Sequence, residues 1–280
     1  MPRNYYYLVA GLPDIAEDIQ KKLPSVQDFL HDIIDAVDPD DRESLMTLLY
    51  SGEHQNICAL LDEKPDLFKP DGLYTRESLQ TELRSPDTLP SYVQEYLELR
   101  RSGAFPVPGL LAEDQLNYLL YTHVCKKYDS GSFLNRYFSF DCALRNVLSI
   151  LNIRKLKESP DSTAALSPVD SILPIDEISE QIRTSNLPDM GIGSHYPWIE
   201  RLLAQDKSNL PDYDRLADTI RWEFLDECTI FSYFSLDAIM AFIIKLGIVS
   251  RRQSLSDELG SAALDTLLTG LTAGGVPADF

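Results

Sequence analysis

The sequence is poor in the residues that carry much of protein catalysis and metal binding. Its 280 residues include 4 histidines and 4 cysteines, and neither residue type is spaced like the ligands of a zinc site. It has no Cys-x-x-Cys pair and no Gly-x-Ser-x-Gly nucleophile turn. These absences argue against zinc-dependent and serine-hydrolase chemistry, and we expect no metal, no cofactor and no catalytic residues.

A secretory hydrophobic region and an apolar run of membrane-spanning length are also missing from the sequence. The cysteines lie far apart and mostly in apolar or helical stretches, which is typical of buried thiols in a reducing compartment. They are Cys58, Cys125, Cys142 and Cys228. We therefore expect a cytoplasmic protein, which could still attach to a membrane through a protein partner.

Positive charge is scarce. Only 25 basic residues oppose 44 acidic ones, which gives a net charge of −19. A chain with this charge repels a phosphate backbone, so we expect no nucleic-acid partner. The charge either serves solubility alone or complements a basic protein partner. With 44% hydrophobic residues, a soluble chain of this size folds around a substantial core.

Two-residue alternation is rare, whereas the three-to-four-residue period of helices recurs in nearly every long segment. The sequence therefore predicts a mainly α fold, an all-helical bundle or solenoid-like protein with two related helical units. The expected helices are Val26–Val37, Asp40 toward Leu61, Thr75–Leu83, Tyr92–Arg101, Leu110–Lys127, Ser139–Lys157, Asp176–Arg183, Trp198–Ala204, Tyr213–Cys228, Ser235–Lys245 and Ser254–Leu271.

The two related units are predicted from an internal repeat. Tyr137–Asp141 reads Tyr-Phe-Ser-Phe-Asp, and Tyr233–Asp237, 96 residues later, reads Tyr-Phe-Ser-Leu-Asp. The same offset pairs Val124 with Ile220, Tyr128 with Phe224, Val147 with Ile243, Leu148 with Ile244 and Lys155 with Arg251. We expect Ser or Asp to cap a helix start in each copy. The alternative is that a capped amphipathic helix recurs by chance.

The main domain boundary is predicted at the Ser- and Pro-rich segment 159–174, which has no periodic apolar face. An N-terminal helical unit at 1–158 and a C-terminal helical unit at 175–271 would flank this linker, followed by a loose tail at 272–280.

Asp28, His31 and Asp32 lie at helical spacing, which would suit metal ligands. They share their face with Asp35, opposite the apolar stripe formed by Leu30 and its neighbours. We therefore interpret them as a solvated face rather than a metal site.

Glu223, Asp226 and Glu227 form a second acidic cluster, beside Trp222 and Phe224. Paired carboxylates do acid–base work where one is desolvated, but we interpret these as surface or helix-pairing charges.

A glycine-containing segment, Gly191–Tyr196, could present backbone N–H groups to an anion. It lacks the Lys-Ser/Thr ending of a phosphate-binding loop, so we favour a plain connection.

Tyrosine is abundant: the chain has 14, and Tyr5, Tyr6 and Tyr7 stand together near its start. Tyrosine is apolar in body and polar at its tip, a type enriched in contact surfaces. We expect a partner-contact surface in the segment Tyr5–Pro13.

Three stretches carry a family resemblance. Asn4–Asp14 resembles an uncharacterised bacterial family encoded among the subunits of V-type (vacuolar or archaeal-type) ATPases. Leu144–Lys155 and Phe234–Gly260 resemble the C-type subunit of those rotary machines, which is also called the d-type subunit. That family repeats helices with an Arg-Asn pair and a basic ending. The second repeat of this chain departs from the pattern, with Ala241-Phe242 in place of the Arg-Asn pair.

The resemblance implies an all-α, non-catalytic coupler that sits on the membrane rotor ring and receives the central stalk. The partners would be central-stalk subunits and the rotor ring. The protein would lie peripherally at the inner face of the cell membrane, through these partners, and would not be an enzyme. The candidate contact residues are Tyr5, Tyr6, Tyr7, Arg145, Asn146, Arg251 and Arg252. An independent helical adaptor or assembly factor is the first alternative, and a helical metal-dependent hydrolase is the second.

Overall fold

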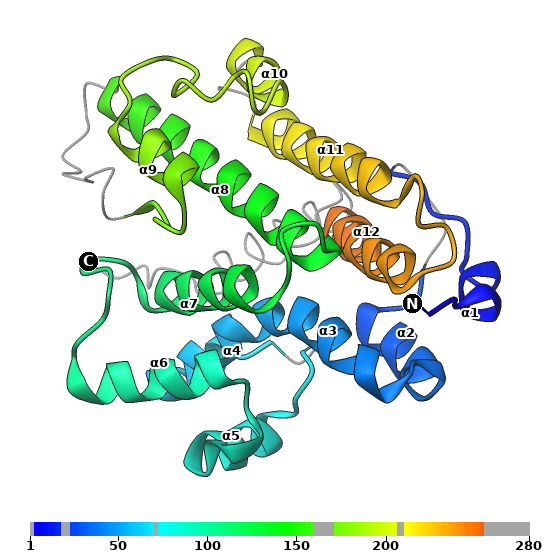
Figure 1. Ribbon diagram of the computed structural model, residues 1–280. Coiled ribbons are helices and arrows are strands. Elements are labelled where there is room, and N and C mark those ends of the chain that lie inside the picture. The colour runs from blue at the N-terminus through cyan, green and yellow to red at the C-terminus, as the bar shows by residue number, and fades with distance from the viewer. Residues whose placement is uncertain (1–2, 18–22, 70–71, 159–170, 206–209, 255–280) are drawn as a thin grey trace, which may run out of the picture. The chain divides into compact units, whose positions relative to one another are not determined.

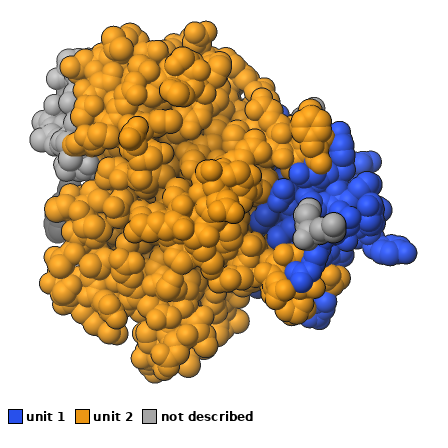
Figure 2. Space-filling view, viewed as in Figure 1, with its two compact units in different colours: residues 1–35, 232–280 blue, residues 36–231 orange. Residues whose placement is uncertain are grey.

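The computed structural model describes residues 3–17, 23–69, 72–158, 171–205 and 210–254. All regular elements within these ranges are helices, so the predicted mainly α fold is confirmed. The chain divides into two compact units, which Figure 2 colours separately. Unit 1 consists of residues 1–35 and 232–280, and unit 2 of residues 36–231.

The units divide elsewhere than at the linker that the sequence predicts. Residues 159–170 of that linker lie outside the described residues, but Ile172 and Leu173 at its end are fully buried. The Asn146 side-chain amide donates to the Leu173 carbonyl at 3.0 Å, and the Leu173 N–H donates to Asn146 Oδ1 at 2.9 Å. This part of the predicted linker is therefore core of unit 2.

The predicted tail at 272–280, and all but the first residue of the helix predicted at 254–271, lie outside the described residues.

Unit 1 is built from both ends of the sequence. Its helices are α1 (Tyr6–Ala10), α2 (Val26–Ile33) and α12 (Leu236–Ser254), and both α1 and α2 pack against α12. Phe29 of α2 meets Phe242 of α12 with ring centroids 4.9 Å apart. Burial of these rings and of the aliphatic residues around them holds the unit together.

Unit 2 contains the remaining helices. They are α3 (Pro39–Leu49), α4 (His54–Leu61), α5 (Arg76–Arg84), α6 (Ser91–Ser102), α7 (Ala112–Lys127), α8 (Phe133–Glu158), α9 (Glu177–Thr184), α10 (Trp198–Ala204) and α11 (Leu210–Thr229). Short 3₁₀ turns of unit 2 occur at Tyr50–Glu53, Pro65–Leu67 and Pro86–Thr88, and a further turn, Ile34–Ala36, spans the boundary between the two units in the sequence.

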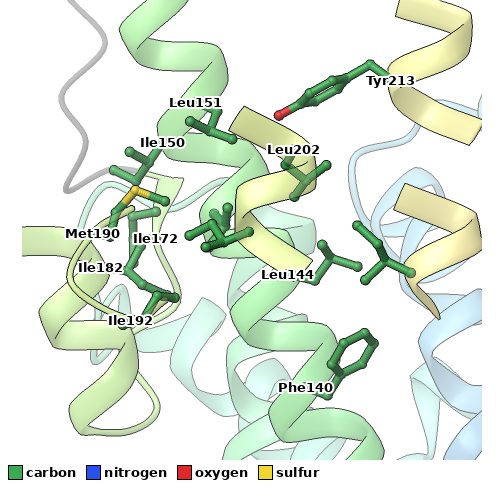
Figure 3. Close-up of a cluster of buried hydrophobic side chains, with 13 residues drawn as sticks. Phe140, Leu144, Ile150, Leu151, Ile172, Ile182, Met190, Ile192, Leu202 and Tyr213 are labelled. Carbon is green, nitrogen blue, oxygen red and sulfur yellow. The ribbon is translucent and has the colours of Figure 1, made fainter. Parts of the chain in front are cut away.

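The two helices α7 and α8 organise unit 2 (Figure 1). Helix α7 packs against α4, α6 and α8, and α8 packs against α7, α9 and α11. A buried cluster brings residues of α8 together with residues of α9, α10, α11 and their connecting segments (Figure 3). It comprises Phe140, Leu144, Val147, Ile150, Leu151, Ile172, Ile182, Met190, Ile192, Ile199, Leu202, Tyr213 and Ile220.

Side chains cap the starts of some of the helices, among them α2, α5 and α9. Ser25 Oγ accepts the N–H of Asp28 at 3.0 Å and so caps α2, as predicted. The helix predicted from Asp40 toward Leu61 is interrupted by the 3₁₀ turn Tyr50–Glu53, which separates α3 from α4. Gly52 lies within this turn, where its poor helix propensity favours the interruption.

The two copies of the repeat differ in local structure. In the second copy Ser235 Oγ accepts the N–H of Asp237 at 3.2 Å at the start of α12, so the predicted cap is confirmed there. In the first copy the prediction is wrong, because α8 already begins at Phe133 and Ser139 lies inside it. The cap is Ser132, whose Oγ accepts the N–H of Asn135 at 3.3 Å.

Candidate functional site

Unit 1 exposes a group of large aromatic side chains. Tyr6 is 54% exposed, Tyr7 96%, Tyr233 65% and Phe234 43%. We call these residues the aromatic surface. They combine the tyrosine cluster near the start of the chain with the second copy of the repeat, two features that lie more than 200 residues apart in the sequence.

Backbone and ring contacts hold the two segments of the aromatic surface together. The Tyr5 N–H donates to the Phe234 carbonyl at 2.6 Å, and the rings of Tyr6 and Phe234 lie 4.7 Å apart. The Tyr5 ring itself is buried. A five-residue helix such as α1 has little stability alone, so these contacts fix where it presents Tyr6 and Tyr7. Tyr5 therefore anchors the surface, while Tyr6 and Tyr7 are its exposed part.

Arg145 and Asn146 lie in unit 2 and therefore in a different unit from the aromatic surface. Arg145 of α8 pairs with Asp114 of α7 and is about one third exposed. Asn146 is fully buried, and both of its bonds to Leu173 are internal. The Asn146 side chain is therefore not accessible to a partner in this structure. Its hydrogen bonds join α8 to the segment around Leu173.

Arg251 and Arg252 stand in the last turn of α12, where basic side chains favour the helix end. Arg252 is tied to Glu17 of the same unit: its Nη1 lies 3.1 Å from the carboxylate and 3.2 Å from the backbone carbonyl of Glu17. Arg251 is exposed. Of the pair, Arg251 is thus the residue that presents its side chain to solvent.

The acidic face of α2 lies in solvent, opposite a stripe of buried residues. Asp28, His31 and Asp32 of α2 are exposed, as is Asp35 in the 3₁₀ turn that follows, whereas Leu30 and Ile33 are buried. The prediction of a solvated face is confirmed for these side chains. The residues that the structure describes hold no group of three or more His, Cys, Asp or Glu side chains arranged to bind a metal.

The Gly191–Tyr196 loop uses several of its N–H groups internally. Gly191 donates to the Asp189 carboxylate at 3.0 Å, and His195 and Tyr196 both donate to the Ile192 carbonyl. This arrangement fits the plain connection that the sequence favours. Burial raises the pKa of Tyr196 to about 12, so its hydroxyl stays protonated at neutral pH.

This loop and the second acidic cluster meet at one cavity of about 380 Å³. His195 and Tyr196 line it from the loop, and Glu223 and Glu227 line it from α11. Asp226, the third acid of the cluster, does not line it. The sequence patterns singled out the loop and the acidic cluster separately, but they did not predict that the two lie close together.

Sequence reasoning missed a network of charged and phenolic groups in unit 2. Asp141 accepts from the Tyr121 hydroxyl at 2.7 Å and from Arg221 Nε at 3.1 Å. Arg221 also lies 3.6 Å from the buried Asp218. Burial, together with the Asp141 carboxylate, raises the pKa of Tyr121 well above its ordinary value. The network joins α7, α8 and α11, and the only sequence signal for it was the repeated aspartate.

A second buried polar group surrounds His54 of α4. Its Nδ1 donates to Asn117 Oδ1 at 2.9 Å, and its Nε2 accepts from the Tyr92 hydroxyl at 2.8 Å. Burial lowers the pKa of His54 to about 4. The neutral ring has both nitrogens satisfied, so this histidine holds α4, α6 and α7 together.

The cysteines are free thiols. The predicted burial is confirmed for Cys142 and Cys228, whereas Cys58 and Cys125 are only half-buried. Burial raises the pKa of Cys58 to about 11, so this thiol is a poor nucleophile at neutral pH. None of the described helices has both the length and the apolar character needed to span a membrane.

A family model described as "Protein of unknown function (DUF2764)" matches residues 2–274. The chain belongs to the DUF2764 family. The match covers nearly the whole chain and confirms the expected membership of a family without an assigned function. No curated protein and no solved structure matches the chain.

Proposed function

We propose that this member of the DUF2764 family is a non-catalytic subunit or accessory protein of a V-type ATPase, and that it docks through the aromatic surface of unit 1. The observation that carries the proposal is the exposure of Tyr6, Tyr7, Tyr233 and Phe234 on contacting segments. Exposed groups of large apolar side chains mark interaction sites more often than inert surface.

The chemistry of these side chains suits a protein partner. Tyrosine buries a large ring at low entropic cost and keeps a hydroxyl for a hydrogen bond at the rim. The short helix α1 is already fixed by the bond from Tyr5 to Phe234, so docking would not have to order it first. We expect Tyr6 and Tyr7 to enter the partner and Phe234 to support them.

The proposed partners are the central-stalk subunits and the membrane rotor ring. Support comes from the resemblance of Asn4–Asp14 to a family encoded with V-type ATPase subunits, and of Leu144–Lys155 and Phe234–Gly260 to the C-type subunit. In this role the protein would couple the stalk to the ring and transmit torque, while ATP hydrolysis takes place in other subunits. Packed helices provide the stiffness that such a role requires.

The test is an affinity pull-down of the tagged full-length protein from native membranes in mild detergent, with quantitative mass spectrometry. We expect stalk and ring subunits at near-stoichiometric amounts. Replacing both Tyr6 and Tyr7 by Ala should lower their recovery roughly tenfold, as loss of central aromatic anchors does at other interfaces. Leu111→Ala is the matched control, because Leu111 is an exposed apolar residue of unit 2.

Two results would count against the rotor role. Recovery of the protein as a lone monomer would exclude a resident subunit, and equal losses for the tyrosine and Leu111 variants would exclude the aromatic surface as the contact. Transient, substoichiometric recovery of ATPase subunits would instead favour the assembly-factor alternative, in which the same surface binds its partner only during construction of the machine.

A further inference from the structure

The cavity beside the Gly191–Tyr196 loop has aromatic walls. Tyr196 and Trp198 line it from the loop and the start of α10, Phe140 from α8, and Phe224 from α11. Its volume of about 380 Å³ lies within the range of small-ligand sites in proteins. All of its lining residues belong to unit 2.

The rings form one continuous series. The centroids of Tyr196 and Trp198 lie 5.2 Å apart, those of Trp198 and Phe140 6.0 Å, and those of Phe140 and Phe224 3.9 Å. Trp198 Nε1 is buried without a hydrogen-bond partner among the described residues, so ring packing holds the indole in the wall. Aromatic faces carry partial negative charge and attract cations.

The charged groups at the cavity add to this preference. Glu223 and Glu227 stand four residues apart on α11 and so share a face. Arg201 of α10 pairs with Glu223. Within the described part of the chain, Glu227 forms no ion pair with any residue. The cavity therefore has one more carboxylate than it has permanent cations.

We propose that this cavity binds an organic cation, an ammonium or guanidinium group, which packs against the rings and pairs with Glu227. Tryptophan is the aromatic side chain that cations prefer, and the net charge of −19 raises the local concentration of cations around the protein. Two sources share this chemistry: a lysine or arginine side chain of another protein, and a free small cation. The proposal does not depend on the ATPase role, since it involves unit 2 alone.

Isothermal titration of the full-length protein with matched pairs of probes tests this site. Choline is compared with 3,3-dimethylbutan-1-ol, its neutral isostere, and Nα-acetyl-lysine methylamide with the norleucine equivalent. Nα-acetyl-arginine methylamide serves as the guanidinium probe. We expect choline and the lysine amide each to bind at least about fivefold more tightly than their neutral isosteres, and the arginine amide to bind at least about fivefold more tightly than the norleucine amide. Tighter binding of the amino-acid amides would identify a protein side chain as the source, and tighter binding of choline a free cation.

Two variants of α11 locate the binding. Glu227→Gln should weaken cation binding about fivefold and leave the neutral probes unchanged, because it removes the charge but keeps the shape. Asp226→Asn removes the same charge from the next position, outside the cavity lining, and should change binding less than about twofold. Equal binding of cations and isosteres, equal effects of the two variants, or no cation binding at tens of millimolar would overturn the proposal.

Discussion

The two copies of the repeated motif have nearly the same sequence, but one copy is buried and the other is exposed to solvent. In unit 2, Phe138 and Phe140 are buried within α8, and Asp141 bonds to Tyr121 and Arg221. In unit 1, Tyr233 and Phe234 precede α12 and lie in solvent. One motif has become a packing element and the other part of an exposed surface.

This difference shows how much the role of a short motif depends on where its helix begins. Starting α8 before the motif places its aromatic residues on helical faces that can enter a core. Starting α12 at Leu236 leaves Tyr233 and Phe234 outside the helix. The repeat is still visible farther along, where Val147 and Ile243 are both buried and Leu148 and Ile244 are both half-buried.

The largest difference between the copies is expected at their aspartates. Asp141→Asn should lower the free energy of unfolding by about 4 kcal/mol, because the half-buried Asp141 carboxylate accepts hydrogen bonds from both Arg221 and the buried Tyr121, and each bond to a charged group contributes about 2 kcal/mol. Asp237→Asn, in the first turn of α12, should cost about 1 kcal/mol or less, the usual contribution of an acid at a helix start. Urea unfolding followed by far-UV circular dichroism measures both.

Hydrogen exchange of peptides from α8 and α12 would then assign each loss to its unit. Similar losses for the two aspartate variants would contradict the contrast between a core motif and a surface motif.

The next effect concerns two of the four histidines: His54, which is buried in unit 2, and His31, which is exposed in unit 1. His54 has a pKa of about 4 in the folded protein and near 6.5 when unfolded. As the pH falls, the His54 ring is therefore protonated in the unfolded chain before it is protonated in the folded protein. The contribution of the neutral ring to the free energy of unfolding is fully present above pH 6.5 and is lost as the pH falls toward 4. The expected loss from this group is about 3 kcal/mol.

The measurement is the pH dependence of unfolding for the wild type, His54→Gln and His31→Gln. His54→Gln should lack this part of the acid-induced loss, and His31→Gln, on the exposed face of α2, should keep it. An unchanged pH slope in His54→Gln would show that His54 is not held neutral in the folded protein.

The smallest expected difference in stability is between variants at the serines of the two motifs, Ser235 and Ser139. Ser235→Ala removes the cap of α12 and should destabilise unit 1 by about 1 kcal/mol. Ser139→Ala lies inside α8 and should change stability by less than about 0.5 kcal/mol, since alanine has the higher helix propensity. We expect Ser235→Ala to speed hydrogen exchange at the start of α12, and Ser139→Ala to leave exchange in α8 unchanged. Equal changes in exchange at the two helices would contradict a capping role for Ser235 alone.

Local patterns in the sequence predicted most of the helices, because capping and apolar periodicity act within a few residues. Ser25 at the start of α2 and the segment Trp198–Ala204 of α10 are examples. The start of α8 was missed because Ser132 competes with Ser139 as a cap, and propensity alone does not decide between them.

Contacts between distant segments could not be predicted in this way. The bonds from Asn146 to Leu173 and from Tyr5 to Phe234 join residues whose surroundings are set by packing. The sequence did suggest tyrosines as a contact surface, and it marked the acidic cluster of α11. That Glu227 shares a cavity with Trp198 depends on how α10 meets α11, which local patterns in a single sequence do not encode.

The aromatic surface can form only in a chain that has been translated as far as the second copy of the motif. Because Tyr6 is fixed against Phe234, a ribosome must translate all of unit 2 before the surface can assemble. At ordinary elongation rates this takes on the order of ten seconds or more. A chain truncated before residue 232 would have α1 without the segment that positions it. Partner binding through this surface would thus exclude chains that end before the second copy of the motif.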